Sequence, residues 1–137
     1  MADLPLLLLL LWALAAPALA ADPRSMLREL EAQARAANPA FKGFSAERGA
    51  AFYRSERPGG DGKPVACASC HTPDPKAVGR TRANKDIQPL APGANRERFT
   101  DPAKVDKWFR RNCNDVLGRA CSVEEKGDFL AYLISVK

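Results

Sequence analysis

The stretch that decides the fold is VACASCHTPD, from Val65 to Asp74. Its centre, CASCH, places two thiols three residues apart and an imidazole directly after the second thiol. Covalent attachment of a c-type haem needs this arrangement, because two thiols add to the two vinyl groups and the adjacent imidazole reaches the iron. The spacing therefore predicts that Cys67 and Cys70 form thioethers and that His71 is the proximal iron ligand.

Two other kinds of site use a similar pattern. A thioredoxin-like redox pair is typical of a βαβ unit, which the flanking sequence does not predict. A zinc site needs four well-spaced ligands, and His71 directly beside Cys70 is poorly placed for a second pair. We therefore favour haem c with its iron. The alternative is an exported helical domain with a disulfide and no haem.

The ligand on the other face of the iron is not obvious. His71 is the only histidine, and the only two methionines, Met1 and Met26, lie before the motif. In a class I cytochrome the sixth ligand comes from after it. The remaining donors are lysine amines, cysteine sulfur, tyrosine, carboxylates, an amide oxygen, or nothing.

The N-terminus predicts a signal peptide, residues 1–20. An apolar run from Leu6 to Leu14 is too short to span a bilayer with margin, and Pro17-Ala-Leu-Ala20 has small residues where a signal peptidase reads. Asp3 stands where a signal carries Lys or Arg, and an uncleaved membrane anchor is the alternative. We expect cleavage after Ala20 and a periplasmic protein.

Charge narrows the class of partner. All 21 basic residues and all but one of the 16 acidic residues follow Ala20, which leaves the mature chain with a net charge of +6. That balance favours acidic partners. Nucleic acid is not expected as a partner, because basic and acidic residues are interleaved and the chain is exported.

The periodicity of apolar residues predicts helices and no strand. Four helices are expected, one capped by Ser25 and reaching about Ala37, one from Ala46 to about Glu56 after Ser45, one from Pro102 after Asp101, and one that starts at Ser122 with Glu125 as a capping box. Residues 72–99 are rich in Pro, Gly, Arg and Lys. We expect a long irregular segment there, which suits a chain that wraps a haem.

Two helical segments resemble those of class I cytochromes c, in which an N-terminal helix with a glycine meets a C-terminal helix with an aromatic. These segments are Gly49-Ala-Ala-Phe52-Tyr53 and Leu130-Ala-Tyr132-Leu133. A glycine permits such close approach, because the facing ring can lie on bare backbone. The expected fold is all-α, the class I cytochrome c fold, with residues 21–44 as an N-terminal helix and linker and residues 45–137 as the cytochrome domain.

The helix after Asp101 offers a distal ligand. Val105, Trp108 and Phe109 set its apolar face, and Asn112 follows four residues after Trp108, so the stripe that faces the core should end in an amide. Trp108 is then expected to contact the haem. Two alternatives stay open. Asn112 is an ordinary asparagine near a helix end, or a lysine is the ligand, although Lys104 and Lys107 lie off the stripe.

The other two cysteines, Cys113 and Cys121, most simply pair with each other in an oxidising compartment. Closing so short a loop should stabilise the fold by about 2.5 kcal/mol on the entropic model. The bond would also hold the helix beside Asn112.

Most of the stretch from Ala46 to Leu133 is similar to the sphaeroides haem protein family. The segments that carry the resemblance are Gly79-x-Thr81, Lys85-x-Ile87-x-Pro-Leu-Ala-Pro92, Glu97-Arg-Phe-Thr-Asp101, Lys104-Val-x-Lys-Trp108-x-x-Arg-Asn-Cys-Asn114, Gly118-Arg-x-Cys121 and Glu125-Lys-Gly-Asp-Phe-Leu130. One departure is Ala83-Asn84, where the family pattern has Thr-Gly.

That resemblance implies a small periplasmic cytochrome with thioethers at Cys67 and Cys70, iron ligands His71 and Asn112, and a Cys113–Cys121 disulfide. It also implies that the asparagine leaves the iron on reduction and that the ferrous form binds oxygen and other diatomics. The implied electron donors are other cytochromes, either a dihaem cytochrome c or a membrane cytochrome b.

Three functions are then open. The first is electron transfer with redox-gated binding of O₂, NO or CO. The second is an enzyme that turns over a diatomic or peroxide, which would need a distal acid or base other than histidine. The third is a gas carrier or sensor without electron transfer.

Overall fold

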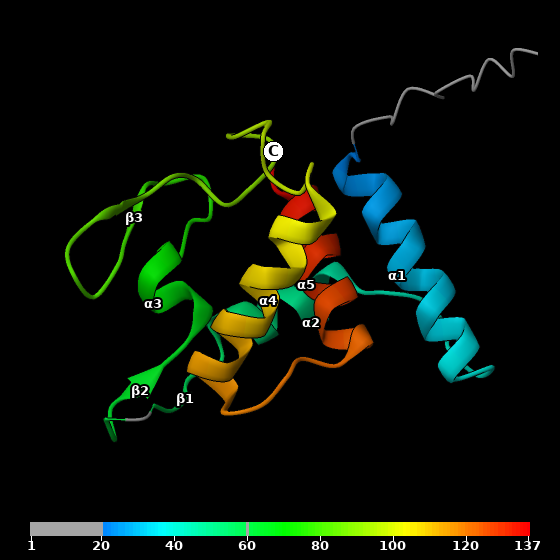
Figure 1. Ribbon diagram of the computed structural model, residues 1–137, viewed down its shortest axis with the longest axis horizontal. Coiled ribbons are helices and arrows are strands. Elements are labelled where there is room, and N and C mark those ends of the chain that lie inside the picture. Colours follow the sequence, from blue (N-terminus) through cyan, green and yellow to red (C-terminus); the bar gives the residue numbers. More distant parts are fainter. Residues whose placement is uncertain (1–20, 60) are drawn as a thin grey trace, which may run out of the picture.

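Five helices make up most of the regular structure in the computed structural model, which describes residues 21–59 and 61–137 (Figure 1). They are α1 (Pro23–Ala37), α2 (Ala46–Arg54), α3 (Cys67–His71), α4 (Pro102–Leu117) and α5 (Val123–Ser135). The expected signal peptide lies outside the described residues. Within them, every helix is too short or too polar to cross a bilayer.

Capping chemistry sets where α4 and α5 begin, as the sequence predicted. The Asp101 carboxylate accepts a hydrogen bond from the amide of Lys104 at 3.0 Å, one residue before Pro102 opens α4. The Ser122 hydroxyl accepts from the amide of Glu125, whose carboxylate accepts from the Ser122 amide in return. Each cap satisfies backbone donors that the first helical turn leaves free.

The predicted start of α1 at Ser25 is wrong by three residues. Asp22 is the N-cap, and its carboxylate accepts from the amides of Arg24 and Ser25. Pro23 stands at the first helical position, where its missing N–H costs nothing. Ser25 still takes part, because its hydroxyl accepts from the Asp22 amide and completes a capping box.

Two very short hairpins contradict the expectation of no strand. β1 (Arg57–Pro58) pairs antiparallel with β2 (Pro64–Val65), and β3 (Gly79–Arg80) pairs antiparallel with β4 (Asp86–Ile87). Two residues per strand are too few for the alternation of polar and apolar residues that identifies a strand in sequence. The rest of residues 72–99 is irregular, as expected, and the all-α class stands.

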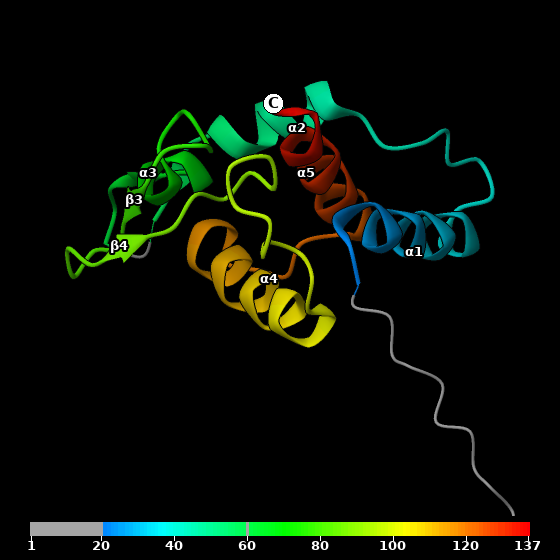
Figure 2. The same cartoon turned by 90° about the horizontal axis from the view of Figure 1, so that it is seen from above.

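α5 is the central helix of the fold, with α2 crossing one side and α1 packed along another (Figures 1 and 2). A Cβ placed on Gly49 of α2 would lie 1.9 Å from the carbonyl oxygen of Asp128 and 2.8 Å from the Cβ of Tyr132. Only glycine therefore permits this crossing. The close approach was predicted, although the neighbour is the backbone of α5 as much as the aromatic ring.

An ion pair between exposed Arg48 and buried Asp128 joins the same two helices. Asp128, only 7% exposed, accepts from the guanidinium of Arg48 at 2.7 and 2.8 Å and from the backbone amide of Ser45 at 2.7 Å. The hydrogen bond that Arg48 donates to Asp128 raises the pKa of Arg48 above its ordinary value. A buried carboxylate needs such partners, and here it holds the start of α2 against α5.

The core forms around this crossing. Tyr53, Leu130 and Leu133 are completely buried, and Met26 of α1 joins them from the other side of α5. The ring of Tyr53 lies 5.5 Å from that of Tyr132, centroid to centroid, and 6.2 Å from that of Phe129. These aromatics bring the start of the haem motif against the helix pair, because Cys67 packs on the same cluster.

Candidate haem site

The predicted attachment residues form one short helix. Cys67 and Cys70 are both free thiols, partly buried, at the two ends of a single turn of α3, and His71 closes that helix. The Ser69 hydroxyl accepts from the amide of Ala66 at 2.9 Å and holds the helix start. Residues three apart in a helix share a face, so the two thiols lie one above the other.

Burial shifts the pKa values of two side chains of this helix, Cys67 and His71. It raises the pKa of the Cys67 thiol to about 11, which keeps the thiol protonated at neutral pH. It lowers the pKa of His71 to about 4, with a smaller contribution from the positive charge of Arg98. His71 is therefore a neutral imidazole at neutral pH, the form that binds a metal.

Tyr53 holds the backbone that follows His71. Its hydroxyl, at the end of a fully buried ring, contacts the carbonyl oxygens of His71 at 3.0 Å and Thr72 at 2.5 Å. Burial raises the pKa of Tyr53 far above its ordinary value, so the hydroxyl stays a donor. Thr72 needs such support, because its φ of 62° and ψ of 160° lie in a region that β-branched residues avoid.

A second support comes from β3. A Cβ on Gly79 would lie 2.1 Å from the carbonyl oxygen of Cys70. The hairpin therefore passes directly against the backbone of α3, and a side chain at this position would push it away. Gly79 stood in the family pattern, but its sequence context did not predict which backbone it would touch.

Arg98 joins the loop around His71 from the far end of the irregular segment. Its guanidinium donates to the carbonyl oxygens of Gln88 at 2.6 Å and Pro89 at 2.9 Å. The next residues of that loop, Leu90 and Ala91, donate from their amides to the carbonyl of Pro75, at 2.8 and 2.9 Å. The role of Arg98 was not predicted, because neither its spacing nor its neighbours in the sequence indicate a guanidinium that binds backbone carbonyls.

α4 carries the predicted distal residues, but its faces divide differently from the prediction. Phe109 packs on Phe129 of α5, with ring centroids 5.6 Å apart, and Cys113 is buried beside it. Trp108, 43% exposed, and Asn112, also exposed, form an adjoining stripe that no other described helix covers. The prediction of a single stripe that faces the core was wrong. Successive residues of a helix point about 100° apart, so Trp108 and Phe109 lie on different faces.

The surroundings of Asn112 bear on the alternatives to its role as the distal ligand. α4 continues for five residues beyond it and ends at Gly118 in the left-handed conformation, so Asn112 is not a helix-terminal asparagine. Lys104 and Lys107 are exposed, as expected. Arg111 folds back, with its guanidinium carbon 5.2 Å from the centre of the Trp108 ring.

The predicted disulfide between Cys113 and Cys121 is confirmed. The two sulfurs are bonded, the Cα atoms lie 5.6 Å apart, and both residues are buried. The bond ties α4, at the residue after Asn112, to the chain just before α5. It therefore limits how far the end of α4 can move relative to the core.

The donor set fits a haem better than a bare metal ion. In residues 21–59 and 61–137 no three side chains of His, Cys, Asp or Glu gather as a metal site. A haem iron brings its own equatorial ligands, so a single imidazole is enough to hold one face of it. The two free thiols one turn apart suit two vinyl groups. α3 lies at the end of the molecule away from α1, and α4 lies between α3 and α1 in both views (Figures 1 and 2). Leu90 and Phe99 add buried apolar surface.

Comparison with known proteins agrees with this chemistry. Residues 39–133 match a family described as "Domain of unknown function (DUF1924)". The chain is 48% identical over 122 residues to cytochrome c-type protein SHP of Cereibacter sphaeroides, covering 88% of this chain and 90% of that protein. It is 45% identical over 103 residues to cytochrome c'' of Methylophilus methylotrophus, covering 74% and 72%.

Solved structures of the same two proteins are similar to this fold. Oxidised cytochrome c'' superposes with a TM-score of 0.77 at 40% identity, over 84% of this chain and 94% of that one. Oxidised SHP, described as an oxygen-binding cytochrome c, gives 0.68 at 45% identity, over 78% and 94%. These matches confirm the class I cytochrome c fold and covalently bound haem c. The chain therefore belongs to the DUF1924 family, as a c-type cytochrome homologous to SHP.

Proposed function

We propose that this protein is a periplasmic electron-transfer cytochrome in which His71 and Asn112 bind the two faces of the haem iron, and in which the ferrous form binds O₂, NO or CO. The observation that carries the proposal is the place of Asn112, exposed on the stripe of α4 next to Trp108. The Asn112 side chain has no hydrogen-bond partner in the described part of the chain. A relative described as oxygen-binding supports the same conclusion.

Other donors are poorer candidates. The chain has no second histidine, and of its two methionines Met26 is buried against α5 while Met1 belongs to the expected signal peptide. Cys113 is held in the disulfide. Tyr53 and Tyr132 are buried in the helix crossing, where Tyr53 is used to hold the carbonyls beside His71. Of the exposed lysines of α4, Lys107 lies on another face of the helix, whereas Lys104 lies one turn before Trp108 and is the remaining rival.

The chemistry of an amide makes this site a redox gate. Haem supplies one-electron redox chemistry and, when an axial position is open, a site for a diatomic gas. An amide oxygen is a hard, weak donor that suits ferric iron better than the softer ferrous ion. Reduction should therefore weaken the bond to Asn112, while the neutral imidazole of His71 remains bound. The disulfide at Cys113 would keep the released side chain close enough to rebind on oxidation.

Spectroscopy of the purified protein tests this proposal. We expect a high-spin or weak-field ferric spectrum and a ferrous form that binds CO rapidly. Asn112→His should become low-spin in both oxidation states and bind CO far more slowly, whereas Asn112→Ala should keep fast binding. As a matched control, Asn114→Ala removes an amide one position beyond Cys113 and should change neither spectrum. A low-spin ferrous protein that ignores CO would contradict the assignment of Asn112.

The cellular location has its own test. We propose export through the signal peptide at residues 1–20, because the Ala-x-Ala site precedes a capped helix that begins at Pro23. The mass of the protein recovered from a periplasmic extract should correspond to a chain that begins at Ala21 and carries one haem. A membrane-bound protein of full length would support the anchor instead.

A further inference from the structure

A surface hollow lies against the haem-attachment helix on the side of Cys70. Its volume is about 370 Å³, and its wall includes Ser69 and Cys70 of α3 and Val65 of β2. Because Cys70 is a predicted thioether, this wall would carry one of the two covalent links between protein and haem, at the surface of the molecule. Electron transfer does not need direct contact with iron, but it falls steeply with distance, so such a point is a natural place for a redox partner.

Cations line the rim of this hollow. Lys63, Arg80 and Arg82 all contribute to it, and all three are exposed. Arg80 is paired with Asp86 at 3.1 Å, whereas Lys63 and Arg82 form no ion pair in residues 21–59 and 61–137. Asp61 is the one acidic residue of the rim, and its carboxylate accepts from the backbone amide of Lys63 at 3.1 Å. Besides that hydrogen bond, the positive charges of Arg82 and Lys63 help to lower the pKa of Asp61 without forming an ion pair with it, so the rim, with three cations and one carboxylate, keeps a net positive charge.

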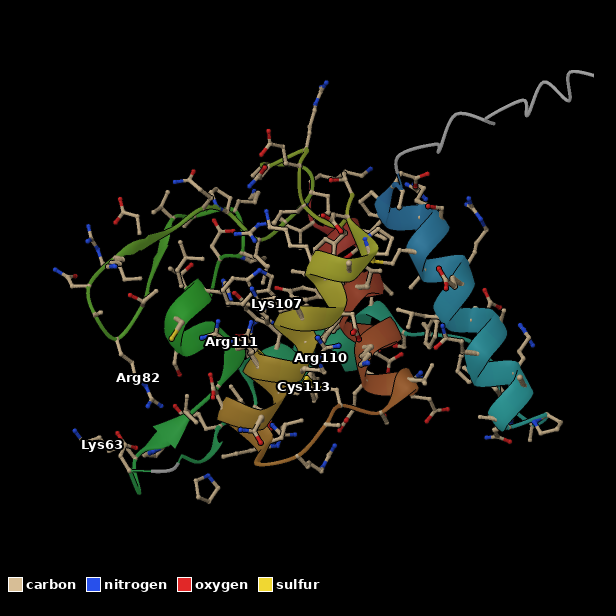
Figure 3. The ribbon with its side chains drawn as sticks, viewed as in Figure 1. Lys63, Arg82, Lys107, Arg110, Arg111 and Cys113 are labelled. Atoms are coloured by element: carbon tan, nitrogen blue, oxygen red, sulfur yellow. A yellow bond between two sulfur atoms is a disulfide. The ribbon has the colours of Figure 1, made fainter. Side chains whose placement is uncertain are left out.

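Arg82 also connects this hollow to α4. It contributes to a second hollow, of about 330 Å³, whose wall includes Asn114 and Asp115, two and three residues after Asn112. Figure 3 shows Lys63 and Arg82 extending from two different loops beyond α3, at the end of the molecule opposite α1. Arg82 thus borders both the hollow beside α3 and the hollow beside the end of α4, the two helices that carry the candidate haem residues.

We propose that the Cys70 hollow, with Lys63 and Arg82 on its rim, is the docking site for an acidic redox protein that donates electrons to this cytochrome. The inference rests on the electron-transfer role proposed above and specifies which surface serves it. In each encounter one electron leaves the partner's redox centre and reduces the ferric iron to ferrous, and no atom is transferred. A hollow rimmed by cations, with Asp61 as its single carboxylate, suits a protruding acidic protein surface better than a flat anionic membrane, which would not enter it.

Charge reversal on the holoprotein tests the site. The donor probe is flavodoxin hydroquinone, an acidic one-electron reductant, and stopped-flow absorbance follows haem reduction under nitrogen. We expect the second-order rate constant for the Lys63→Glu/Arg82→Glu variant to fall about tenfold or more at low ionic strength, because opposite charges steer the encounter. The matched control is Arg24→Glu/Arg28→Glu, which makes the same change in net charge on exposed positions of α1 and should stay within about twofold of wild type.

Salt and lipid complete the experiment. Raising the ionic strength should bring all three proteins to similar rates, because screening removes the steering. Equal losses in the two charge-reversed variants, or none in either, would overturn the docking site. A third result would also overturn it. If phosphatidylglycerol vesicles bind wild type but not the Lys63→Glu/Arg82→Glu variant, and flavodoxin reduces both proteins at the same rate, the surface would serve a membrane instead.

Failure of the underlying function looks different. A wild-type protein that accepts electrons slowly from flavodoxin at every salt concentration would remove the electron-transfer role, and the docking site with it. Binding of CO to dithionite-reduced protein would be unaffected by that result, so the diatomic-binding part of the proposed function is judged separately.

Discussion

The crossing of α2 with α5 and the pair α3 with α4 are built on opposite principles. At the crossing, Gly49 lies against backbone, Asp128 has three donors, and the aromatic rings are buried by one another. Across α3 and α4, the thiols are free and Trp108 and Asn112 are exposed. The first region is completed by the chain's own atoms, whereas the second presents donors and apolar surface suited to a cofactor.

This difference predicts that substitutions in one region should affect stability and substitutions in the other should affect function. Substitutions at the crossing should act through packing, and they should be felt in the free energy of unfolding. Substitutions across α3 and α4 should act through haem attachment and ligation. Tyr53 belongs to both regions, because its ring is buried in the crossing and its hydroxyl reaches the backbone of His71.

The largest effect is expected from Cys67→Ser/Cys70→Ser, which removes both thioether sulfurs. Covalent haem should be lost entirely, because a hydroxyl does not add to a vinyl group as a thiolate does. Haem staining after denaturing electrophoresis measures this directly. The disulfide variant Cys113→Ser/Cys121→Ser is the matched control and should keep its stain. Equal staining in both variants would contradict the role assigned to α3.

The next effect is Gly49→Val at the crossing. A Cβ there would meet the Asp128 carbonyl oxygen at 1.9 Å, so the two helices must move apart. We expect a loss of about 4 kcal/mol in the free energy of unfolding, the range of severe core substitutions. Chemical denaturation followed by far-UV circular dichroism measures it, with exposed Ala51→Val in the same helix as the control. Similar losses for the two variants would mean that helix propensity, rather than the crossing, sets the effect.

The disulfide comes third, since it links the two regions. Cys113→Ser/Cys121→Ser should lower the free energy of unfolding by about 2.5 kcal/mol on the chain-entropy model for so short a loop. It should also loosen the end of α4 that follows Asn112, so the ferrous protein should bind CO at least as fast as wild type. Slower CO binding would argue against a restraint that keeps Asn112 near the iron. Reduction of the wild-type protein with a thiol reagent should reproduce the variant.

The smallest effect is Tyr53→Phe, which removes one hydroxyl and leaves the ring. The carbonyls of His71 and Thr72 would lose their donor, at a cost of about 1–2 kcal/mol. A change confined to stability would place Tyr53 in the crossing alone. We expect in addition a shift in reduction potential, because the support of the backbone beside the proximal ligand is weakened. Tyr132→Phe is the control, since its hydroxyl accepts from exposed Arg54 and lies away from His71.

Much of the fold was predictable because short-range chemistry specifies it. Helices α2, α4 and α5 begin where their capping residues predicted. Each of these caps, Ser45, Asp101 and Ser122, accepts a hydrogen bond from a backbone amide three residues later. Asp22 was missed only because Ser25, three residues later in the same capping box, is an equally good capping residue. The close approach at Gly49 was also predicted, because a glycine lowers the intrinsic stability of a helix and a close contact with its bare backbone can compensate for that loss.

The candidate site was predicted only in part. The roles of Cys67, Cys70, His71, Asn112 and Trp108 stay predictions. The first three lie within five residues of sequence, so their closeness in space follows from the sequence alone. The contacts of Arg98 and Tyr53 were not foreseen, because their partners are backbone carbonyls 9, 10, 18 and 19 residues away, and any residue has a carbonyl.

By itself, the sequence determined the haem chemistry, the disulfide and the helices, since each depends on side chains a few residues apart. Only the tertiary structure decided that Trp108 and Asn112 share a face distinct from that of Phe109, and that Lys63, Cys70 and Arg82 border one hollow. Those relations depend on how segments distant in the chain pack around α5. Packing of that kind follows from the summed contacts of the whole core, and no local pattern of residues encodes it.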